Sequence, residues 1–171
     1  TRLTYVGELG WELYLPTVDG LVLWEKIMAA GKSQGIKACG YRAIESLRLE
    51  KGYRAWAGEI NTETNPYEAG LGFAVSLKKD NFHGKAAAIA AQANLTRKLV
   101  AITFDDITCV PFGSEPIRVG EKIVGRIKSG GQGYTIKKAI AYAYLPIAQT
   151  EVGTKVEVEF FGTWRSGVIC A

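Results

Sequence analysis

The sequence predicts an α+β protein, in which a segment that mixes helices with strands is followed by a segment that is almost entirely β. Apolar residues recur at helical spacing in the first part of the chain, whereas residues 97–171 contain short strand-like runs separated by Gly and Pro. Consecutive short strands of this kind are typical of a small barrel or sandwich. Residues 94–96 form the junction, so we expect two domains, covering residues 1–95 and 96–171.

Three helices are expected in the first domain. Leu21, Trp24, Ile27 and Met28 follow helical spacing, after Asp19 as a candidate N-cap and before Gly31 as a candidate C-cap, which predicts the first helix. The other two helices are expected at about residues 40–51, with Gly52 as the stop, and at about residues 84–93.

Strands are expected in both domains. In the first domain, a pair of short strands is expected within residues 3–15 and one further strand over residues 69–77. The stretch from Ser129 to Tyr134 is rich in glycine, but it lacks the lysine of a phosphate loop and precedes a strand, so we expect a turn there. The strands of the second domain are expected at residues 98–104, 117–119, 122–127, 139–145, 155–161 and 163–170.

Composition and charge argue against several functional classes. The net charge is +4 and is scattered in isolated pairs such as Lys78–Lys79, so no nucleic-acid partner is expected. No apolar run reaches the ~20 residues that a membrane-spanning helix needs, so no membrane partner is expected. The chain has three dispersed cysteines (Cys39, Cys109 and Cys170) and a single histidine, which indicates neither a disulfide framework nor a metal site.

The stretch from Tyr5 to Glu12 concentrates groups that can bind a planar ligand. It contains two carboxylates, Glu8 and Glu12, two aromatic residues and two glycines within eight residues. In a straight strand Glu8 and Glu12 would share one face, because the side-chain period of a strand is two. A carboxylate accepts two parallel hydrogen bonds from a donor-rich edge, and Tyr5 offers a flat apolar face. A surface hairpin with solvated acids fits the same pattern.

The second helix carries charged residues at i,i+3 spacing. Arg42 and Arg48 both lie three residues from Glu45. Pairs of this kind stabilise a helix by only ~0.2–0.5 kcal/mol and are usually solvated. We therefore expect these charges to lie at the surface.

Four motifs occur together along the chain. They are Tyr-Val-Gly-Glu-Leu-Gly-Trp-Glu at residues 5–12, Ser-Leu-Arg-Leu-Glu-Lys-Gly-Tyr-Arg-Ala-Trp at 46–56, Pro-Tyr-Glu-Ala-Gly-Leu-Gly-Phe-Ala-Val at 66–75, and Ile-Ala-Tyr-Ala-Tyr-Leu-Pro at 140–146. In this order they resemble the folate-binding C-terminal part of the glycine-cleavage T-protein (aminomethyltransferase) family, and most closely its dimethylglycine oxidase and sarcosine dehydrogenase branch.

The resemblance implies a T-protein-like folate-binding α/β domain, present in part, followed by a small all-β barrel domain. It implies one-carbon metabolism, in which an iminium or formaldehyde unit from the oxidation of dimethylglycine or sarcosine is captured as 5,10-methylenetetrahydrofolate. Tetrahydrofolate is the implied cofactor, with Glu12 on the pterin edge and Tyr5 against the folate. FAD is implied only for a flavin domain that precedes this chain, and the implied location is cytoplasmic, or the mitochondrial matrix in a eukaryote.

Two departures from the family pattern qualify this expectation. Ile44 stands where glycine-cleavage T-proteins carry a folate-binding arginine, which leaves Arg42 and Arg48 as candidates for the folate tail. The family's catalytic aspartate lies upstream of Thr1, so no catalytic residue is expected here, and the isolated chain is expected to be an inactive piece of a parent enzyme. The alternatives are a glycine-cleavage aminomethyltransferase or a non-catalytic folate-binding regulatory module.

Overall fold

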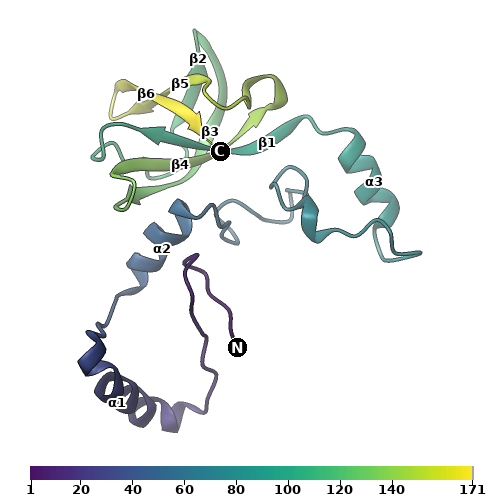
Figure 1. Cartoon of the computed structure of the whole chain (residues 1–171). Coiled ribbons are helices and arrows are strands. Elements are labelled where there is room, and N and C mark those ends of the chain that lie inside the picture. The colour runs from purple at the N-terminus through teal and green to yellow at the C-terminus, as the bar shows by residue number, and fades with distance from the viewer. Residues whose placement is uncertain (171) are drawn as a thin grey trace.

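The structure, a computed structural model that describes residues 1–170, is dominated by a closed six-stranded barrel in the second half of the chain (Figure 1). All strands pair antiparallel in the order β1-β4-β3-β2-β5-β6, and β6 closes the barrel against β1. The predicted fold class is therefore confirmed, and the alternative of a sandwich is wrong. The strands are β1 (Arg97–Phe104), β2 (Pro116–Val119), β3 (Lys122–Gly133), β4 (Lys138–Pro146), β5 (Lys155–Phe160) and β6 (Thr163–Cys170).

Strand β4 is buried on both of its faces. Alternate residues such as Ala141 and Leu145 point into the barrel core, where they join Ile102 and Val158. The intervening residues Ile140, Tyr142 and Tyr144 belong to a second cluster on the outside of the barrel, together with Leu49 and Leu99. An outer face of a barrel is buried only when another element covers it. Here that element is the helix α2 (Tyr41–Glu50).

Helix α2 is joined to the barrel by a buried polar network. The guanidinium of Arg48 contacts the carboxylate of Glu59 at 2.8 Å, and both side chains are about 1% exposed or less. The hydroxyl of Ser129 on β3 donates to Glu59, and the hydroxyl of Tyr144 on β4 donates to the Glu59 carbonyl at 2.9 Å. The hydroxyl of Tyr142 donates to the Leu49 carbonyl at 2.6 Å. Arg48 therefore does not lie at the surface as the sequence predicts.

The glycine-rich stretch continues a strand instead of forming the predicted turn. Strand β3 runs through to Gly133 and pairs with β4 as far as Lys138. A Cβ atom at Gly130 would overlap the carbonyl oxygen of Pro111, and one at Gly131 would lie 2.5 Å from Leu49 Cδ1. These glycines allow β3 to pack closely against Pro111 and Leu49, and they do not turn the chain.

The predicted strand over residues 69–77 is a series of turns. The side-chain oxygen of Asn65 accepts hydrogen bonds from the backbone N–H groups of Tyr67 and Glu68, at 3.0 Å each. An asparagine that bonds to its own backbone two and three residues ahead favours a turn over an extended strand. Gly70 then takes a positive φ of 70°, and a short 3-10 helix follows at Gly72–Ala74.

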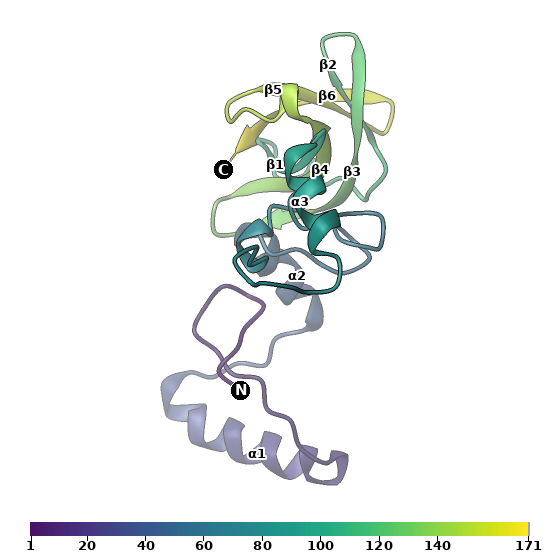
Figure 2. The same cartoon turned by 90° about the vertical axis from the view of Figure 1, so that its right-hand side faces the viewer.

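The remaining helices extend away from the barrel. Helix α1 (Gly20–Gly31) has no buried residue, and helix α3 (Lys85–Ala93) forms the arm that leads into β1. Figures 1 and 2 agree that α1 lies farthest from the barrel, with the N-terminal loop between α1 and α2. Asp19 holds the N-cap position without a side-chain cap. Gly31 does not end the helical path, which continues through a 3-10 turn to Gly35 in the left-handed conformation.

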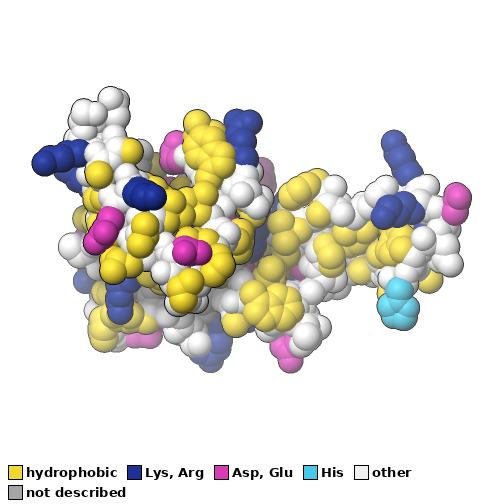
Figure 3. All heavy atoms as spheres, turned by 90° about the horizontal axis from the view of Figure 1, so that it is seen from below, with side chains coloured by type: hydrophobic (Ala, Val, Ile, Leu, Met, Phe, Trp, Pro, Cys, Tyr) yellow, Lys and Arg dark blue, Asp and Glu magenta, His cyan; other side chains and the backbone are white. Residues whose placement is uncertain are grey.

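Exposed apolar side chains gather in the first part of the chain. Leu21 and Trp24 of α1 are 67% and 51% exposed, and Trp11 in the N-terminal loop is 60% exposed. Seen from below in Figure 3, hydrophobic side chains cover much of the face that carries these elements. Residues 1–41 thus add little to the hydrophobic core, which lies in and around the barrel.

Three further observations concern membrane-spanning helices, metal-binding groups and the cysteines. Among residues 1–170, no helix is long and apolar enough to cross a membrane. Within the same range, no three His, Cys, Asp or Glu side chains are grouped so that they could hold a metal ion. All three cysteines are free, with Cys109 buried and Cys39 exposed.

Candidate functional site

The candidate site begins with a loop formed by the first twelve residues. The backbone N–H of Glu12 donates to the Thr1 carbonyl at 2.9 Å, which brings the two ends of the loop together. Residues 5–9 form a bend and not the predicted pair of strands. Gly7 has a positive φ of 74° at the tip, where a Cβ atom would overlap the side chain of Lys51. Residues 8–12 do not form a strand, so the alternation that would have placed Glu8 and Glu12 on one face does not apply.

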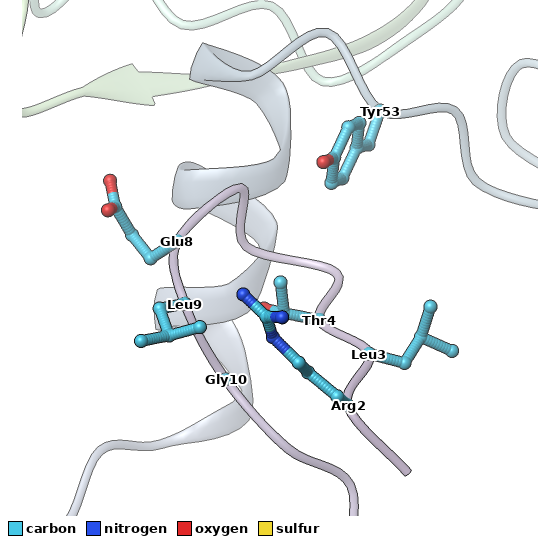
Figure 4. A pocket seen from close by; sticks show the side chains of 7 residues that line it. All are labelled: Arg2, Leu3, Thr4, Glu8, Leu9, Gly10 and Tyr53. Atoms are coloured by element: carbon cyan, nitrogen blue, oxygen red, sulfur yellow. The ribbon is translucent and has the colours of Figure 1, made fainter.

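The loop encloses a pocket next to the residues that follow α2. The pocket has a volume of about 460 Å³. Figure 4 shows the guanidinium of Arg2 between the two arms of the loop and the ring of Tyr53 above them, whereas the side chain of Leu3 points outward. The volume lies within the ~300–1,000 Å³ typical of small-molecule sites. The lining residues are Arg2, Leu3, Thr4, Glu8, Leu9, Gly10 and Tyr53.

Tyr5 lies at the tip of the loop and forms an aromatic pair with Tyr53. Their ring centroids are 5.9 Å apart, and the ring planes are inclined by 29°. The hydroxyl of Tyr5 donates to the Arg54 carbonyl at 2.7 Å, which fixes the ring against the segment that follows α2. Burial raises the pKa of Tyr5, so the phenol stays protonated at neutral pH.

Tyr53 is the residue of this pair that the sequence did not single out. It follows Gly52, which has a positive φ of 76° and ends α2. The sequence feature that could have pointed to Tyr53 is its position directly after the glycine that ends the helix. Its pairing with Tyr5 is nevertheless a long-range contact that one sequence cannot reveal.

Glu12 lies at the base of the loop, away from the aromatic pair. Its carboxylate accepts a hydrogen bond from the hydroxyl of Tyr14, and this bond raises the pKa of Tyr14. Between residues 1 and 170 the structure shows no hydrogen bond that joins Glu12 to Tyr5, and Glu12 does not line the pocket. The other carboxylate, Glu8, does line it. The assignment of Tyr5 and Glu12 as ligand-binding residues stays a prediction.

The two arginines considered for the folate tail differ in their surroundings. Arg48 donates to Glu45, to Glu59 and to the Tyr53 carbonyl, so its guanidinium is committed to contacts within the protein. Its burial explains why it is not available to a ligand tail. Arg42 is exposed on the first turn of α2, two residues before Ile44.

The site therefore combines a tyrosine pair, a pocket with a cationic side chain, and two carboxylates on one short loop. An aromatic pair of this kind can bind a flat heterocycle through its face, and a carboxylate can accept two adjacent N–H donors from the edge of that heterocycle.

Comparison with known proteins accounts for both halves of the chain. Residues 1–79 match the family model of the GCVT N-terminal domain, and residues 97–171 match that of the glycine cleavage T-protein C-terminal barrel domain. The chain is 45% identical to human mitochondrial dimethylglycine dehydrogenase over 98% of its length. It is 43% identical to an aminomethyltransferase of Symbiobacterium thermophilum over 92% of its length.

A solved structure has the same fold. The glycine cleavage system aminomethyltransferase T of Bartonella henselae superposes on the whole chain with a TM-score of 0.91 at 28% identity. The chain spans 48% of that protein, 42% of the Symbiobacterium aminomethyltransferase and 20% of human dimethylglycine dehydrogenase. On the matches to both domain models and the agreement in fold, this chain belongs to the glycine cleavage T-protein (aminomethyltransferase) family.

Proposed function

We propose that this chain binds tetrahydrofolate at the N-terminal loop and serves folate-dependent one-carbon transfer. The observation that carries the proposal is the stacked pair of Tyr5 and Tyr53 beside a pocket of about 460 Å³, in a member of the T-protein family. The residues present fit the ligand's chemistry. A pterin is a flat ring with two adjacent N–H donors, which suit an aromatic platform and the carboxylate of Glu12.

In this proposal each residue of the loop has a distinct task. Tyr5 and Tyr53 hold the face of the pterin, and Glu12 accepts hydrogen bonds from its donor edge. Because Glu12 does not line the pocket and is bonded to Tyr14, this role requires its carboxylate to turn toward the pterin when the ligand binds. The hydroxyl bond from Tyr5 to the Arg54 carbonyl keeps the platform in place before the ligand arrives. Tetrahydrofolate supplies the two nitrogen atoms that accept a one-carbon unit, while the chain orients it.

The one-carbon unit comes from an N-methyl amine. We infer that an iminium or formaldehyde unit released by oxidation of dimethylglycine or sarcosine is captured as 5,10-methylenetetrahydrofolate. The 45% identity to dimethylglycine dehydrogenase over nearly the whole chain supports this branch of the family. The oxidation itself requires FAD, which we assign to another part of the parent enzyme. By analogy with the mitochondrial relatives, the location in a eukaryote is the mitochondrial matrix.

A second candidate is the aminomethyl transfer of the glycine cleavage system. The 43% identity to an aminomethyltransferase favours it. The two candidates differ in the carbon donor. An enzyme of the N-methyl amine branch forms methylenetetrahydrofolate from a released iminium or formaldehyde unit, whereas an aminomethyltransferase needs a protein-bound aminomethyl group. Isotope tracing from methyl-labelled sarcosine in the parent enzyme distinguishes them.

Substitution of the tyrosine pair tests the folate site. We expect Tyr5→Ala and Tyr53→Ala each to weaken tetrahydrofolate binding roughly threefold to tenfold, because stacking contributes about 0.5–1.5 kcal/mol beyond area burial. Tyr5→Phe keeps the ring but loses the hydroxyl bond to the Arg54 carbonyl, so it should weaken binding less than Tyr5→Ala does. Isothermal titration of the chain measures these affinities.

Tyr134→Ala serves as the matched control, because Tyr134 is 67% exposed, directly follows the last residue of β3 and does not line the pocket. Equal affinities for Tyr5→Ala, Tyr53→Ala and the control would show that the tyrosine pair does not hold the ligand.

A further inference from the structure

A second cleft lies where the segment after α2 meets the barrel. It has a volume of about 210 Å³ and is bounded by β1, the end of β6 and the turn that precedes β5. Gly52 and Arg54 line it, whereas Tyr53 between them lines the pocket in the N-terminal loop. The two cavities thus adjoin the same short segment, residues 52–54. The residues that line this cleft are Gly52, Arg54, Lys98, Leu99, Val100, Ala101, Tyr142, Thr150, Val152, Ile169 and Cys170.

The charged residues that line the cleft are both cations. They are Arg54, which is partly buried, and Lys98, which is exposed on β1. Within residues 1–170, neither has a carboxylate at ion-pair distance. A partly buried cation without a counter-charge attracts an anion more strongly than a solvated one does, because less water screens it.

Arg54 retains donors that the protein does not use. Its Nε donates to the Ala69 carbonyl at 2.9 Å, and one Nη donates to the Gly52 carbonyl. A guanidinium has five N–H donors, and the second Nη has no hydrogen-bond partner within the described part of the chain. That nitrogen lies beside Gly70, which does not line the cleft, but the Nη that donates to Gly52 keeps a second N–H that can bind one oxygen of an anion.

The other polar groups of the cleft are neutral. Burial raises the pKa of Tyr142 to about 12, and its hydroxyl donates to the Leu49 carbonyl. Burial also raises the pKa of the Cys170 thiol, so it stays protonated at neutral pH. Val152, which is 61% exposed, adds apolar surface, whereas the side chains of Val100 and Ile169 are buried in the barrel core. The cleft therefore combines positive charge with an exposed apolar side chain.

We propose that this cleft binds a small aliphatic carboxylate. Its cations would bind the carboxylate, and the exposed side chain of Val152 would contact the short alkyl part. The volume is below the ~300–1,000 Å³ of sites for larger ligands, so only a small molecule or one end of a longer one fits. The carboxylate has two sources in folate-dependent chemistry of this kind, a free N-alkyl amino acid or the glutamyl tail of folate. The site itself does not depend on folate binding in the N-terminal loop.

The test is a titration of the full chain with sodium acetate, followed by the backbone amide signals in two-dimensional NMR. Sodium chloride at the same ionic strength is the reference. We expect saturable shifts at Val100, Ala101 and Thr150 with acetate and none with chloride. Arg54→Gln should weaken acetate binding roughly tenfold or more, since a hydrogen bond to a charged group is lost. Arg165→Gln, on an exposed arginine of β6 outside the cleft, should leave binding unchanged.

Because Arg54 also holds the loop through the Ala69 carbonyl, Lys98→Gln provides a second variant on an exposed side chain. It should weaken acetate binding while the thermal unfolding curve stays that of the wild type. Equal shifts with acetate and chloride, or an unchanged acetate affinity in both Arg54→Gln and Lys98→Gln, would overturn the proposal.

Competition identifies the source of the carboxylate. If the folate tail occupies the cleft, tetrahydrofolate displaces acetate whereas tetrahydropteroate, which lacks the glutamyl group, does not. If neither tetrahydrofolate nor tetrahydropteroate displaces acetate but sarcosine does, the occupant is a free amino acid. Glu12→Gln should leave acetate binding unchanged, so failure of the folate site and failure of this cleft can be told apart.

Discussion

At the scale of single residues, the buried pair of Arg48 and Glu59 is the centre of the polar network that joins α2 to the barrel through Ser129 and Tyr144. Removing both charges from water is costly, and the cost is offset here by hydrogen bonds from Ser129 and from the Ala55 backbone N–H at 2.7 Å. Loss of one partner leaves the other charge buried without compensation. We therefore expect Arg48 and Glu59 to tolerate single substitutions poorly.

Glu59→Gln tests this contact. We expect it to lower the free energy of unfolding by about 3–5 kcal/mol, because the Arg48 guanidinium keeps only Glu45 as a charged partner. Glu121→Gln is the control, since Glu121 is 97% exposed and lies 3.9 Å from Arg118. It should change stability by no more than about 0.5 kcal/mol. Urea unfolding of the two variants provides the comparison, and similar losses in both would show that the buried pair does not anchor α2.

At the scale of elements, the start of β1 is tied to the turn that precedes α3. The guanidinium of Arg97 contacts the Glu68 carboxylate at 3.0 Å, and the Leu99 backbone N–H donates to the Glu68 carbonyl at 2.8 Å. Burial alone would raise the pKa of Glu68, but hydrogen bonds from Arg97 and from the Asn65 backbone hold it below its ordinary value of 4.5.

This lowered pKa makes part of the stability depend on pH. A carboxyl with a lower pKa in the folded state stabilises the fold above its unfolded pKa, and the contribution is lost as the pH falls through the folded value. We expect Glu68→Gln to be less stable than the wild type at neutral pH and equally stable once the pH is well below 4.5. Unfolding curves recorded between neutral and acid pH measure this difference.

Glu63→Gln, an exposed carboxylate nearby, should keep the pH dependence of the wild type. A stability difference between Glu68→Gln and the wild type that stays constant across the acid range would contradict the assigned role of the Glu68–Arg97 pair.

Periodicity and turn residues predict the regular elements well. The helices α2 and α3 and five of the six barrel strands lie close to the expected residues, since alternating or helical spacing carries that information. Strand β3 begins where expected but continues through the glycine-rich stretch to Gly133. The strands expected at residues 3–15 and 69–77 are absent from the structure. At the first, Gly7 bends the chain at positive φ, and at the second, Asn65 starts a turn. Local hydrogen bonds and tertiary packing override strand propensity at both places.

The candidate site is less predictable than the fold. Tyr5 and Glu12 stand out by residue type and by the resemblance of their motif, but their separation within the loop depends on its bend. Tyr53 pairs with Tyr5 across 48 positions of the chain. Arg48 becomes unavailable to a ligand only because Glu59 and Ser129 surround it. Contacts between distant segments of this kind cannot be inferred from spacing in one sequence.

At the scale of the whole molecule, the barrel holds the core while the first forty residues and the α3 arm lie outside it. The closed barrel leaves no free strand edge, which protects it from local opening. Helix α1 buries no side chain, and α3 extends from the barrel as an exposed arm (Figure 1). Few buried contacts and an exposed backbone mark segments of low local stability.

Limited proteolysis tests this division. Lys78, Lys79 and Lys85 lie before or at the start of α3, where the backbone has few tertiary contacts, so we expect trypsin to cut there before it cuts the barrel. Mass spectrometry of the early fragments identifies the sites. The fragment that contains β1–β6 should persist, whereas early cleavage at Lys155 or Arg165 would contradict an independently stable barrel.

The measurement that tests the central claim most directly is the affinity of the chain for tetrahydrofolate with and without the Glu12 carboxylate. Glutamine can accept only one of the two pterin hydrogen bonds and presents a donor to the other. Loss of a hydrogen bond to a charged group costs about 1.5–3 kcal/mol, so Glu12→Gln should bind roughly tenfold to a hundredfold more weakly. Glu25→Gln, on an exposed carboxylate of α1 outside the pocket, should bind like the wild type. Equal affinities of Glu12→Gln and the wild type would contradict the folate site proposed here.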